Sequence, residues 1–302
     1  MTCDKSKLYP KFLFYNLSQS QTTEYLHSIA EASTSAYPSL KPSDIEALYI
    51  LLPTLSEQRI IASVLSSLDD KIDLLHRQNI TLEKMAETLF RQWFVEEVKE
   101  EWEMESILDF AKHHKIAIQP QQNPSTIFYH YSIPAFDNNK NPVVELGKSI
   151  QSTKYAIPEN CILFSKLNPH KDKRIWLLQD EVKESSICST EFQIVLPKKK
   201  EYLFFLHGWL SLKENYNEIA SGVGGTSESH QRIDPASIFD FQCPKPDEKY
   251  ILKYNELVSP MYLKIQINQT QIRTLTQLRG LLLPKLMSGE VRYNNLKIKN
   301  HE

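Results

Sequence analysis

The chain carries a long internal repeat. Residues 12–15 (Phe-Leu-Phe-Tyr) return as residues 202–205 (Tyr-Leu-Phe-Phe), and residues 45–53 return as residues 238–246. A long helical pattern follows each copy, and the two patterns stay aligned without a gap. Short repeats of about 20 to 50 residues stack into solenoids. This repeat is far longer, so the sequence predicts one architectural unit present twice. Such a pseudo-two-fold molecule suits a pseudo-symmetric partner.

Composition sets the broad class of the protein. A chain of 302 residues has room for two domains at roughly 100 to 200 residues each. We expect a soluble, cytoplasmic protein without a membrane segment, because no apolar stretch is long enough for a signal peptide or a bilayer span. The formal net charge of −2 means that any DNA contact must depend on local patches or on a basic partner. The cysteines lack metal-type spacing and are interpreted as reduced thiols: Cys3, Cys161, Cys188 and Cys243.

Each copy of the repeat ends in a heptad pattern. Residues 56 to 95 contain no proline or glycine, and apolar residues recur alternately four and three positions apart, as in a coiled coil. At about 1.5 Å per residue this helix would be roughly 60 Å long, too long to bury on one globular domain. The first seam is Ile61, Leu65, Leu68, Ile72, Leu75, Asn79, Leu82, Ala86, Leu89 and Trp93. The second seam is Tyr254, Val258, Met261, Ile265, Asn268, Ile272, Leu275, Arg279, Leu282 and Leu286.

The two seams are expected to pair within one chain. Because the domain between them makes the helices start at opposite ends, the pairing is predicted to be antiparallel. The register places Ile61 against Leu286 and Asn79 opposite Asn268. Two amides in one buried layer can satisfy each other and fix that register. The alternative is that each seam packs on its own globular domain.

The segment between the helices has a different pattern. Short apolar runs at residues 161–164, 174–178 and 192–196 are bounded by Pro, Asn, Asp and Lys, which predicts strands joined by polar loops. An amphipathic helix is expected at about residues 201–220, before a glycine-rich turn at residues 222–225. These features predict a compact α/β domain.

The repeat and the helices together predict the domain organisation. The fold class is α+β, with one α/β domain, two long helices in an antiparallel coiled coil, and an N-terminal partial repeat of the domain. Pro284 is expected to end or kink the second helix, and Gly289 to stop it. The predicted divisions are a stub at residues 1–52, the first long helix at 53–97, the complete domain at 98–246, the second long helix at 247–288 and a tail at 289–302.

Several motifs in this order resemble the specificity subunit of type I restriction-modification enzymes. Residues 52–60 (Leu-Pro-Thr-Leu-Ser-Glu-Gln-Arg-Ile) lead into the first long helix, and residues 82–94 end it. Residues 281–290 (Leu-Leu-Leu-Pro-Lys-Leu-Met-Ser-Gly-Glu) end the second helix. Within the domain, residues 162–169 and 188–192 are similar to segments of that family's target recognition domains. The resemblance covers nearly the whole chain.

The resemblance implies a non-catalytic subunit. In such a subunit, two recognition domains held apart by antiparallel helices each read half of a split double-stranded DNA site. Methyltransferase subunits, and a restriction subunit where present, would use S-adenosylmethionine, ATP and Mg, and this chain would hold no cofactor or metal of its own. The sequence departs from the pattern because its first recognition domain lacks the front part. A second copy of the chain, or a fragment that completes the stub, would then serve the other half-site.

Two segments of the domain are candidates for DNA contact. One is a basic loop between two predicted strands, and the other follows the glycine-rich turn and carries hydroxyl, amide and guanidinium groups. Basic side chains contact phosphates, whereas Asn and Arg reach base edges in the major groove. The alternative for each segment is a solvated connection without DNA contact. The candidate residues are Lys166, Asn168, His170, Lys171, Lys173, Arg174, Gly224, Gly225, Thr226, Ser227, Ser229, His230 and Arg232.

Two other functions stay open at this point. The chain could be an assembly or regulatory protein whose coiled coil binds the methyltransferase without reading DNA. It could also be a DNA-modifying enzyme. The second function is disfavoured because the sequence contains neither a P-loop nor a His-Glu-x-x-His metal helix.

Overall fold

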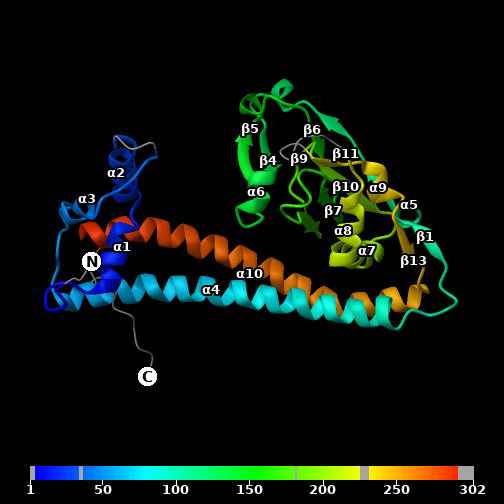
Figure 1. Cartoon of the computed structure of the whole chain (residues 1–302), viewed down its shortest axis with the longest axis horizontal. Coiled ribbons are helices and arrows are strands. Elements are labelled where there is room, and N and C mark those ends of the chain that lie inside the picture. Colours follow the sequence, from blue (N-terminus) through cyan, green and yellow to red (C-terminus); the bar gives the residue numbers. More distant parts are fainter. Residues whose placement is uncertain (1–3, 34–36, 181, 225–230, 292–302) are drawn as a thin grey trace. The chain divides into compact units, whose positions relative to one another are not determined.

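The computed structural model describes residues 4–33, 37–180, 182–224 and 231–291 (Figure 1). The chain forms two compact units, which we call the first unit (residues 1–81 and 263–302) and the second unit (residues 82–262). Two long helices, α4 (Leu55–Arg91) and α10 (Glu248–Ser288), each contribute one part to each unit. Mixed helix and sheet with two long helices confirms the predicted fold class.

The first unit joins three short helices to parts of α4 and α10. These are α1 (Pro10–Leu17), α2 (Ser20–Glu31) and α3 (Pro42–Glu46). Thr54 and Glu57 cap the start of α4, because the Glu57 carboxylate accepts from the Thr54 amide at 2.9 Å. The buried Gln58 donates to the Lys7 carbonyl and accepts from the Tyr9 amide, which ties the N-terminal segment to α4. The core of this unit is Phe12, Tyr15, Ala62, Leu65, Leu283, Leu286 and Met287.

The antiparallel pairing and its register are confirmed in the first unit. Asn268 Nδ2 donates to Asn79 Oδ1 at 2.9 Å, and both side chains are buried. Ile61 packs against the cluster that contains Leu286, as the register requires. At one edge of the seam, Arg279 forms an ion pair with Asp69.

In the second unit the same two helices form an aromatic cluster. Phe90, Phe94 and Tyr254 lie within 5.6 Å of one another by ring centroids, and Phe205 joins them from the following domain. The α4 backbone continues as a π-helix, Gln92–Glu96. Gly208 is required here, because a Cβ on it would lie 2.3 Å from the Phe90 ring.

The repeat in the sequence is therefore a repeat in structure. In the second unit, helices α7 (Tyr202–Ser211), α8 (Lys213–Ser221) and α9 (Pro235–Phe239) precede α10, just as α1, α2 and α3 precede α4. The single helix expected at residues 201–220 is two helices. Leu212, with φ −59° and ψ 134°, interrupts it because an extended ψ breaks the α-helical hydrogen-bond series.

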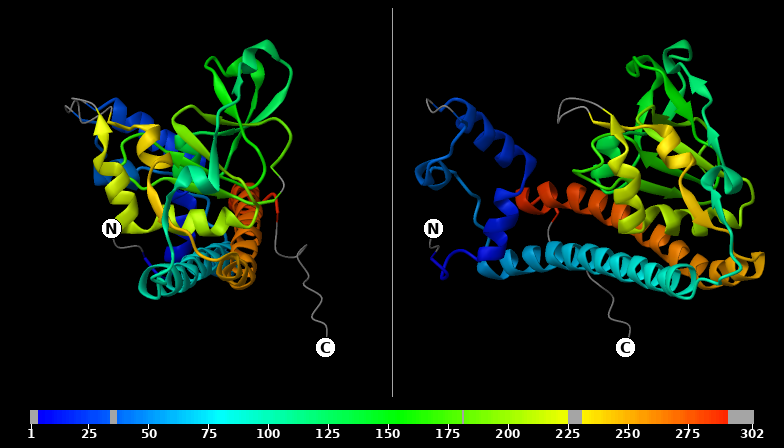
Figure 2. Two further views of the ribbon diagram at one scale, coloured as in Figure 1. Left: turned by 90° about the vertical axis from the view of Figure 1, so that its right-hand side faces the viewer. Right: turned by 45° about the vertical axis from the view of Figure 1, so that its right-hand side comes forward.

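Two sheets build the rest of the second unit (Figures 1 and 2). The first has the order β2-β10-β7-β8 and is antiparallel throughout. The second has the order β3-β6-β9-β4-β5, in which β4 and β9 are parallel. The strands of the first sheet are β2 (Ala111–His114), β10 (Phe192–Pro197), β7 (Cys161–Ser165) and β8 (Ile175–Leu178). Those of the second are β3 (Ala117–Ile118), β6 (Lys154–Ala156), β9 (Ser186–Ser189), β4 (Ile127–Tyr131) and β5 (Val143–Leu146).

Short elements connect these layers. They are β1 (Met104–Ser106), α5 (Ile107–Phe110), α6 (Ile133–Asp137), β11 (Val223–Gly224), β12 (Arg232–Ile233) and β13 (Gln242–Pro244). Two-stranded pairings join β1 to β13 and β11 to β12. The 3-10 turns are Pro120–Gln122 and Gly147–Ser149.

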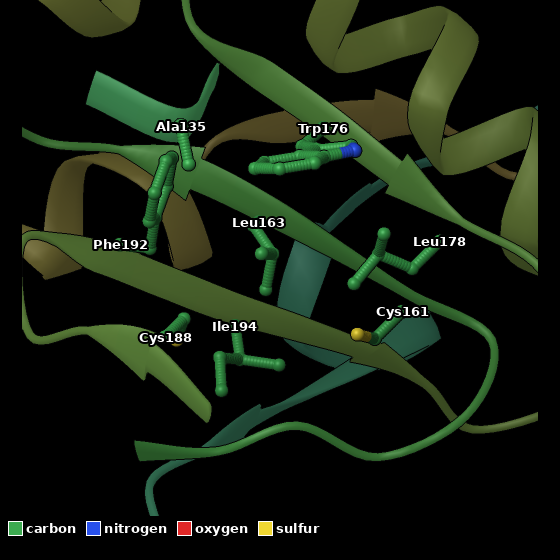
Figure 3. Packing of buried hydrophobic residues seen from close by; sticks show 8 residues of the cluster. All are labelled: Ala135, Cys161, Leu163, Trp176, Leu178, Cys188, Phe192 and Ile194. Carbon is green, nitrogen blue, oxygen red and sulfur yellow. The ribbon is translucent and has the colours of Figure 1, made fainter. Parts of the chain in front are cut away.

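Strand β7 lies at the centre of the domain. All five of its residues are buried, because side chains on one face point into the core shown in Figure 3 and those on the other face the helices. On that second face Phe164 stacks on Tyr216 of α8. The continuous apolar run of β7 therefore reflects burial on both faces, and the strands predicted at residues 161–164, 174–178 and 192–196 are confirmed. The core in Figure 3 consists of Ala135, Cys161, Leu163, Trp176, Leu178, Cys188, Phe192 and Ile194.

Of the two effects predicted for Pro284, an end of the helix is wrong and a kink stays a prediction. Helix α10 does not end there but continues to Ser288. Gly289 then adopts a left-handed φ of +77° and stops it, as expected. A proline forfeits one hydrogen bond, and burial of Leu286 and Met287 in the following turn offsets that loss. No helix in the described ranges is long and apolar enough to cross a bilayer.

The Asn79–Asn268 layer leads to a stability prediction. Asn268→Leu alone leaves the buried Asn79 oxygen without its donor, so the free energy of unfolding should fall by about 1 to 3 kcal/mol. Adding Asn79→Leu removes both amides, and we expect the double variant to recover the loss because leucine suits a coiled-coil seam. Urea denaturation of the wild type, the single variants and the double variant measures the coupling. If the losses in free energy of unfolding of the two single variants simply add in the double variant, the paired layer is contradicted.

Candidate nucleic-acid interface

The structure brings the two candidate DNA segments together. Leu167 and Arg232 form an antiparallel bridge. On either side of it, the Ile233 amide donates to the Lys166 carbonyl and the Asn168 amide donates to the Gln231 carbonyl, both at 2.9 Å. Strand β12 also pairs with β11, which places the Gly224 backbone opposite Arg232. Segments more than 60 positions apart in sequence thus form one surface beside the end of β7.

The basic segment is the connection from β7 to β8. Its turn depends on Asn168, whose φ of +46° lies in the left-handed region that asparagine tolerates. The Lys171 amide donates to the Asn168 carbonyl at 3.1 Å and closes the turn. His170 and Lys171 are exposed, whereas Lys166 and Asn168 are half-buried. This arrangement leaves two basic side chains at the tip, where they can reach phosphates.

Arg174 lies inside the domain rather than on this surface. It is 9% exposed, and its guanidinium contacts Asp137 through two hydrogen bonds of 2.7 and 2.9 Å. A further bond of 2.7 Å joins it to Asp172. The hydrogen bond with Asp137 raises the pKa of Arg174. A DNA contact would require both carboxylates to be released, so we do not retain Arg174 in the interface.

Lys173 is also engaged within the domain. Its Nζ donates to the carbonyl of Ser211 at 2.8 Å, and Ser211 is the last residue of α7. A cation at a helix C-terminus is favoured by the helix dipole. Loss of water contact around the ammonium group lowers the pKa of Lys173. The hydrogen bond to the end of α7 indicates a structural position for this lysine.

Arg232 is the most accessible arginine of the two segments. Its side chain is 44% exposed and pairs with Glu191. The pair involves two hydrogen bonds from one edge of the guanidinium, with Nε to Oε2 at 3.0 Å and Nη2 to Oε1 at 2.9 Å. Glu191 was not among the candidates from the sequence. Residues 188–192 resemble a segment of the target recognition domains of type I specificity subunits, but Arg232, the partner of Glu191, is 41 positions away.

Asn168 Oδ1 is buried and has no partner among the described residues, so its contact with a base stays a prediction. The remaining candidates of the second segment lie outside the described residues: Gly225, Thr226, Ser227, Ser229 and His230.

A cleft elsewhere in the second unit has the opposite charge. Its volume is about 640 Å³, and Trp102 and Tyr202 are among its lining residues. Most of its charged lining is acidic, with Glu101, Glu103, Glu105, Asp109, Asp247 and Glu248 against Lys245. Phosphate oxygens are repelled by such a surface. Among the described residues no group of three or more His, Cys, Asp or Glu side chains is placed to hold a metal ion.

The fold and this surface indicate a class of protein. It has an α+β domain attached to paired long helices, and two adjoining polar and basic segments of that domain are suited to DNA. Residues 2–84 match the family model described as the type I restriction modification DNA specificity domain. The chain is 28% identical over 328 residues to the MjaIX specificity subunit of Methanocaldococcus jannaschii, covering 97% of this chain and 71% of that protein. It is 38% identical over 87 residues to the HindI specificity subunit of Haemophilus influenzae, covering 29% and 19%.

A solved structure shares the fold. The S subunit of a type I restriction-modification system from M. genitalium has a TM-score of 0.57 at 17% identity, covering 94% of this chain and 74% of that one. This structural match and the sequence matches together confirm the predicted resemblance. The chain is similar to the specificity subunits of type I restriction-modification enzymes, which are the non-catalytic subunits of those systems.

The different surroundings of Arg174 and Arg232 predict different effects on stability. Arg174→Ala leaves two carboxylates without their buried partner and should lower the free energy of unfolding by about 1 to 3 kcal/mol. Arg232→Ala removes an exposed ion pair and should cost less than about 1 kcal/mol. Urea denaturation of both variants tests this order. Equal losses would show that the two arginines play the same structural part.

Proposed function

We propose that the second unit of this chain reads one half of a bipartite DNA site and thereby directs a partner adenine methyltransferase to it. The observation that carries the proposal is the pairing of residues 166–168 with residues 231–233, which joins two polar segments into one surface. One segment offers cations for phosphates, and the other offers an arginine for base edges.

The described residues divide between these two tasks. Lys166, His170 and Lys171 would contact the phosphate backbone. Asn168 and Arg232 would contact bases, together with the Gly224 backbone and the candidates at residues 225–230. A side chain that reads a base changes the preference at one position, whereas a phosphate contact changes affinity for all sequences alike. The two roles can therefore be separated by experiment.

The partners follow from the charge of the chain. With a formal net charge of −2, the chain cannot neutralise many phosphates by itself. We propose that methyltransferase subunits supply the missing positive charge, and that they and any restriction subunit use S-adenosylmethionine, ATP and Mg. The complex would act in the cytoplasm, without membrane attachment.

The first unit supports a further part of the proposal. In the second unit β13 pairs with β1 through Met104–Pro244, Glu105–Cys243 and Ser106–Gln242. The counterpart of β13 in the repeat is residues 49–51, which have no strand partner among the described residues. Tyr49 is fully exposed there and Leu51 is 76% exposed. An unpaired segment with exposed apolar side chains, whose counterpart in the repeat is a paired strand, could accept a strand from another polypeptide.

We therefore propose that residues 1–52 are a truncated recognition domain and residues 98–246 the complete one. The second half-site would be read by another polypeptide. A second copy of this chain, arranged head to tail, leads to a palindromic split site. A fragment that completes the stub leads to two different halves.

Partner dependence gives a direct prediction. The isolated chain should bind duplex DNA weakly, and its affinity should fall only slightly with salt, because the slope counts the phosphates that are neutralised. Adding methyltransferase subunits should tighten binding and steepen the slope. Fluorescence anisotropy at several salt concentrations measures both quantities. Tight, sequence-specific binding by the chain alone would contradict the proposal.

The methylated sites of cells that express the complex test the function itself. We expect methylation at a split sequence motif, and we expect this methylation to disappear when the chain is deleted. Arg232→Gln should relax the preference at one base pair by about 1 to 3 kcal/mol if the contact is bidentate. Lys171→Ala should weaken methylation of all sites alike, and Lys198→Ala, which removes an exposed cation outside both segments, should change neither. A single contiguous motif would rule out the split-site arrangement.

A further inference from the structure

The Glu191–Arg232 pair leaves part of the guanidinium available. A guanidinium has five N–H donors in a planar fork. Glu191 takes the edge formed by Nε and one hydrogen of Nη2. Two hydrogens on Nη1 and one on Nη2 remain, and no described residue accepts from Nη1 in a contact of hydrogen-bond length. The end formed by Nη1 and Nη2 can still donate two parallel bonds to guanine O6 and N7.

Glu191 is itself held in place by its backbone. Its carbonyl accepts from the Lys166 amide at 2.9 Å, and its amide donates to Ser189 Oγ at 3.3 Å. The next residue, Phe192, is completely buried at the start of β10. The Glu191 side chain is only 24% exposed. The carboxylate is therefore a fixed point on the same surface as the two candidate DNA segments.

The pair also changes how Arg232 responds to charge. A free guanidinium is attracted to any phosphate, which adds affinity for all sequences. The negative charge of the Glu191 carboxylate offsets the long-range attraction between Arg232 and phosphates. It does not prevent hydrogen bonds from Arg232 to a base edge, because these form only at short range. Holding the long arginine side chain in one orientation also reduces the entropy lost when it binds.

We propose that Glu191 is a positioning residue that determines specificity. It holds Arg232 by one edge so that the other edge meets a guanine, and it suppresses binding of Arg232 to phosphates. This inference rests on the proposed DNA-reading function of the second unit. It assigns no base contact to Glu191 itself.

The test compares Glu191→Gln with a matched control. Glu105→Gln removes the same charge from a side chain of similar exposure, 25% against 24%, that is also paired with an exposed cation, Lys245. Each variant is assembled with the methyltransferase subunits. Binding is then measured to the methylated target, to targets with each base pair replaced in turn, and to an unrelated duplex, over a range of salt concentrations.

We expect Glu191→Gln to reduce discrimination about tenfold or more at the position where Arg232→Gln also reduces it. Affinity for the unrelated duplex should rise, and the salt slope should steepen by roughly one, because one more phosphate is neutralised. In the double variant discrimination should fall no further than in Arg232→Gln. Glu105→Gln should leave discrimination at that position as in the wild type.

Other outcomes overturn the inference. Discrimination that is unchanged in Glu191→Gln excludes positioning by this residue. If Glu191→Gln loses discrimination between base pairs at every position of the target and also has a lower free energy of unfolding, Glu191 has a structural role instead. Loss at a position that Arg232→Gln does not affect makes Glu191 a reader of its own base. A wild-type complex without sequence preference refutes the proposed function, whereas a specific wild type that Arg232→Gln leaves unchanged refutes only this inference.

Discussion

The antiparallel pairing of α4 and α10 is the interaction on which the rest of the structure depends. Neither long helix could bury its seam alone, and in each unit the two seams cover one another. The Asn79–Asn268 hydrogen bond sets the register, because a shift by one heptad would leave each buried amide opposite an apolar side chain. That register brings Tyr254 against the end of α4, where its hydroxyl donates to the Ala86 carbonyl. Helix α7 packs on this aromatic cluster through Phe205.

Most of the charged side chains in and beside the candidate interface form ion pairs or hydrogen bonds within the protein. Arg174 is committed to two carboxylates, Lys173 to the end of α7, and Arg232 to Glu191. His170 and Lys171 remain exposed at the loop tip. A surface of this kind has limited attraction for DNA of any sequence and favours contacts that depend on geometry. This agrees with a subunit that contributes specificity inside a larger complex.

The two copies of the repeat differ in what surrounds the same elements. In the second unit, the segment before α10 is covered by β1 and α5, and Ile238 and Cys243 are fully buried. In the first unit, their counterparts Ile45 and Ile50 are only half-buried, and residues 49–51 are not paired as a strand with any described residue. The same repeated elements are therefore more deeply buried in the second unit than in the first.

The repeat, the long helices, the antiparallel register and three strands of the first sheet could be predicted from the sequence alone. These follow from periodicity and from apolar runs, which are properties of neighbouring residues. Only the tertiary structure decided that Leu212 divides the helix at residues 201–220 and that α10 continues through Pro284. It also separated Arg174 from Arg232, which look equivalent in sequence. Their partners, Asp137 and Glu191, are 37 and 41 positions away, and no local pattern reveals which carboxylate a folded chain will bring to which arginine.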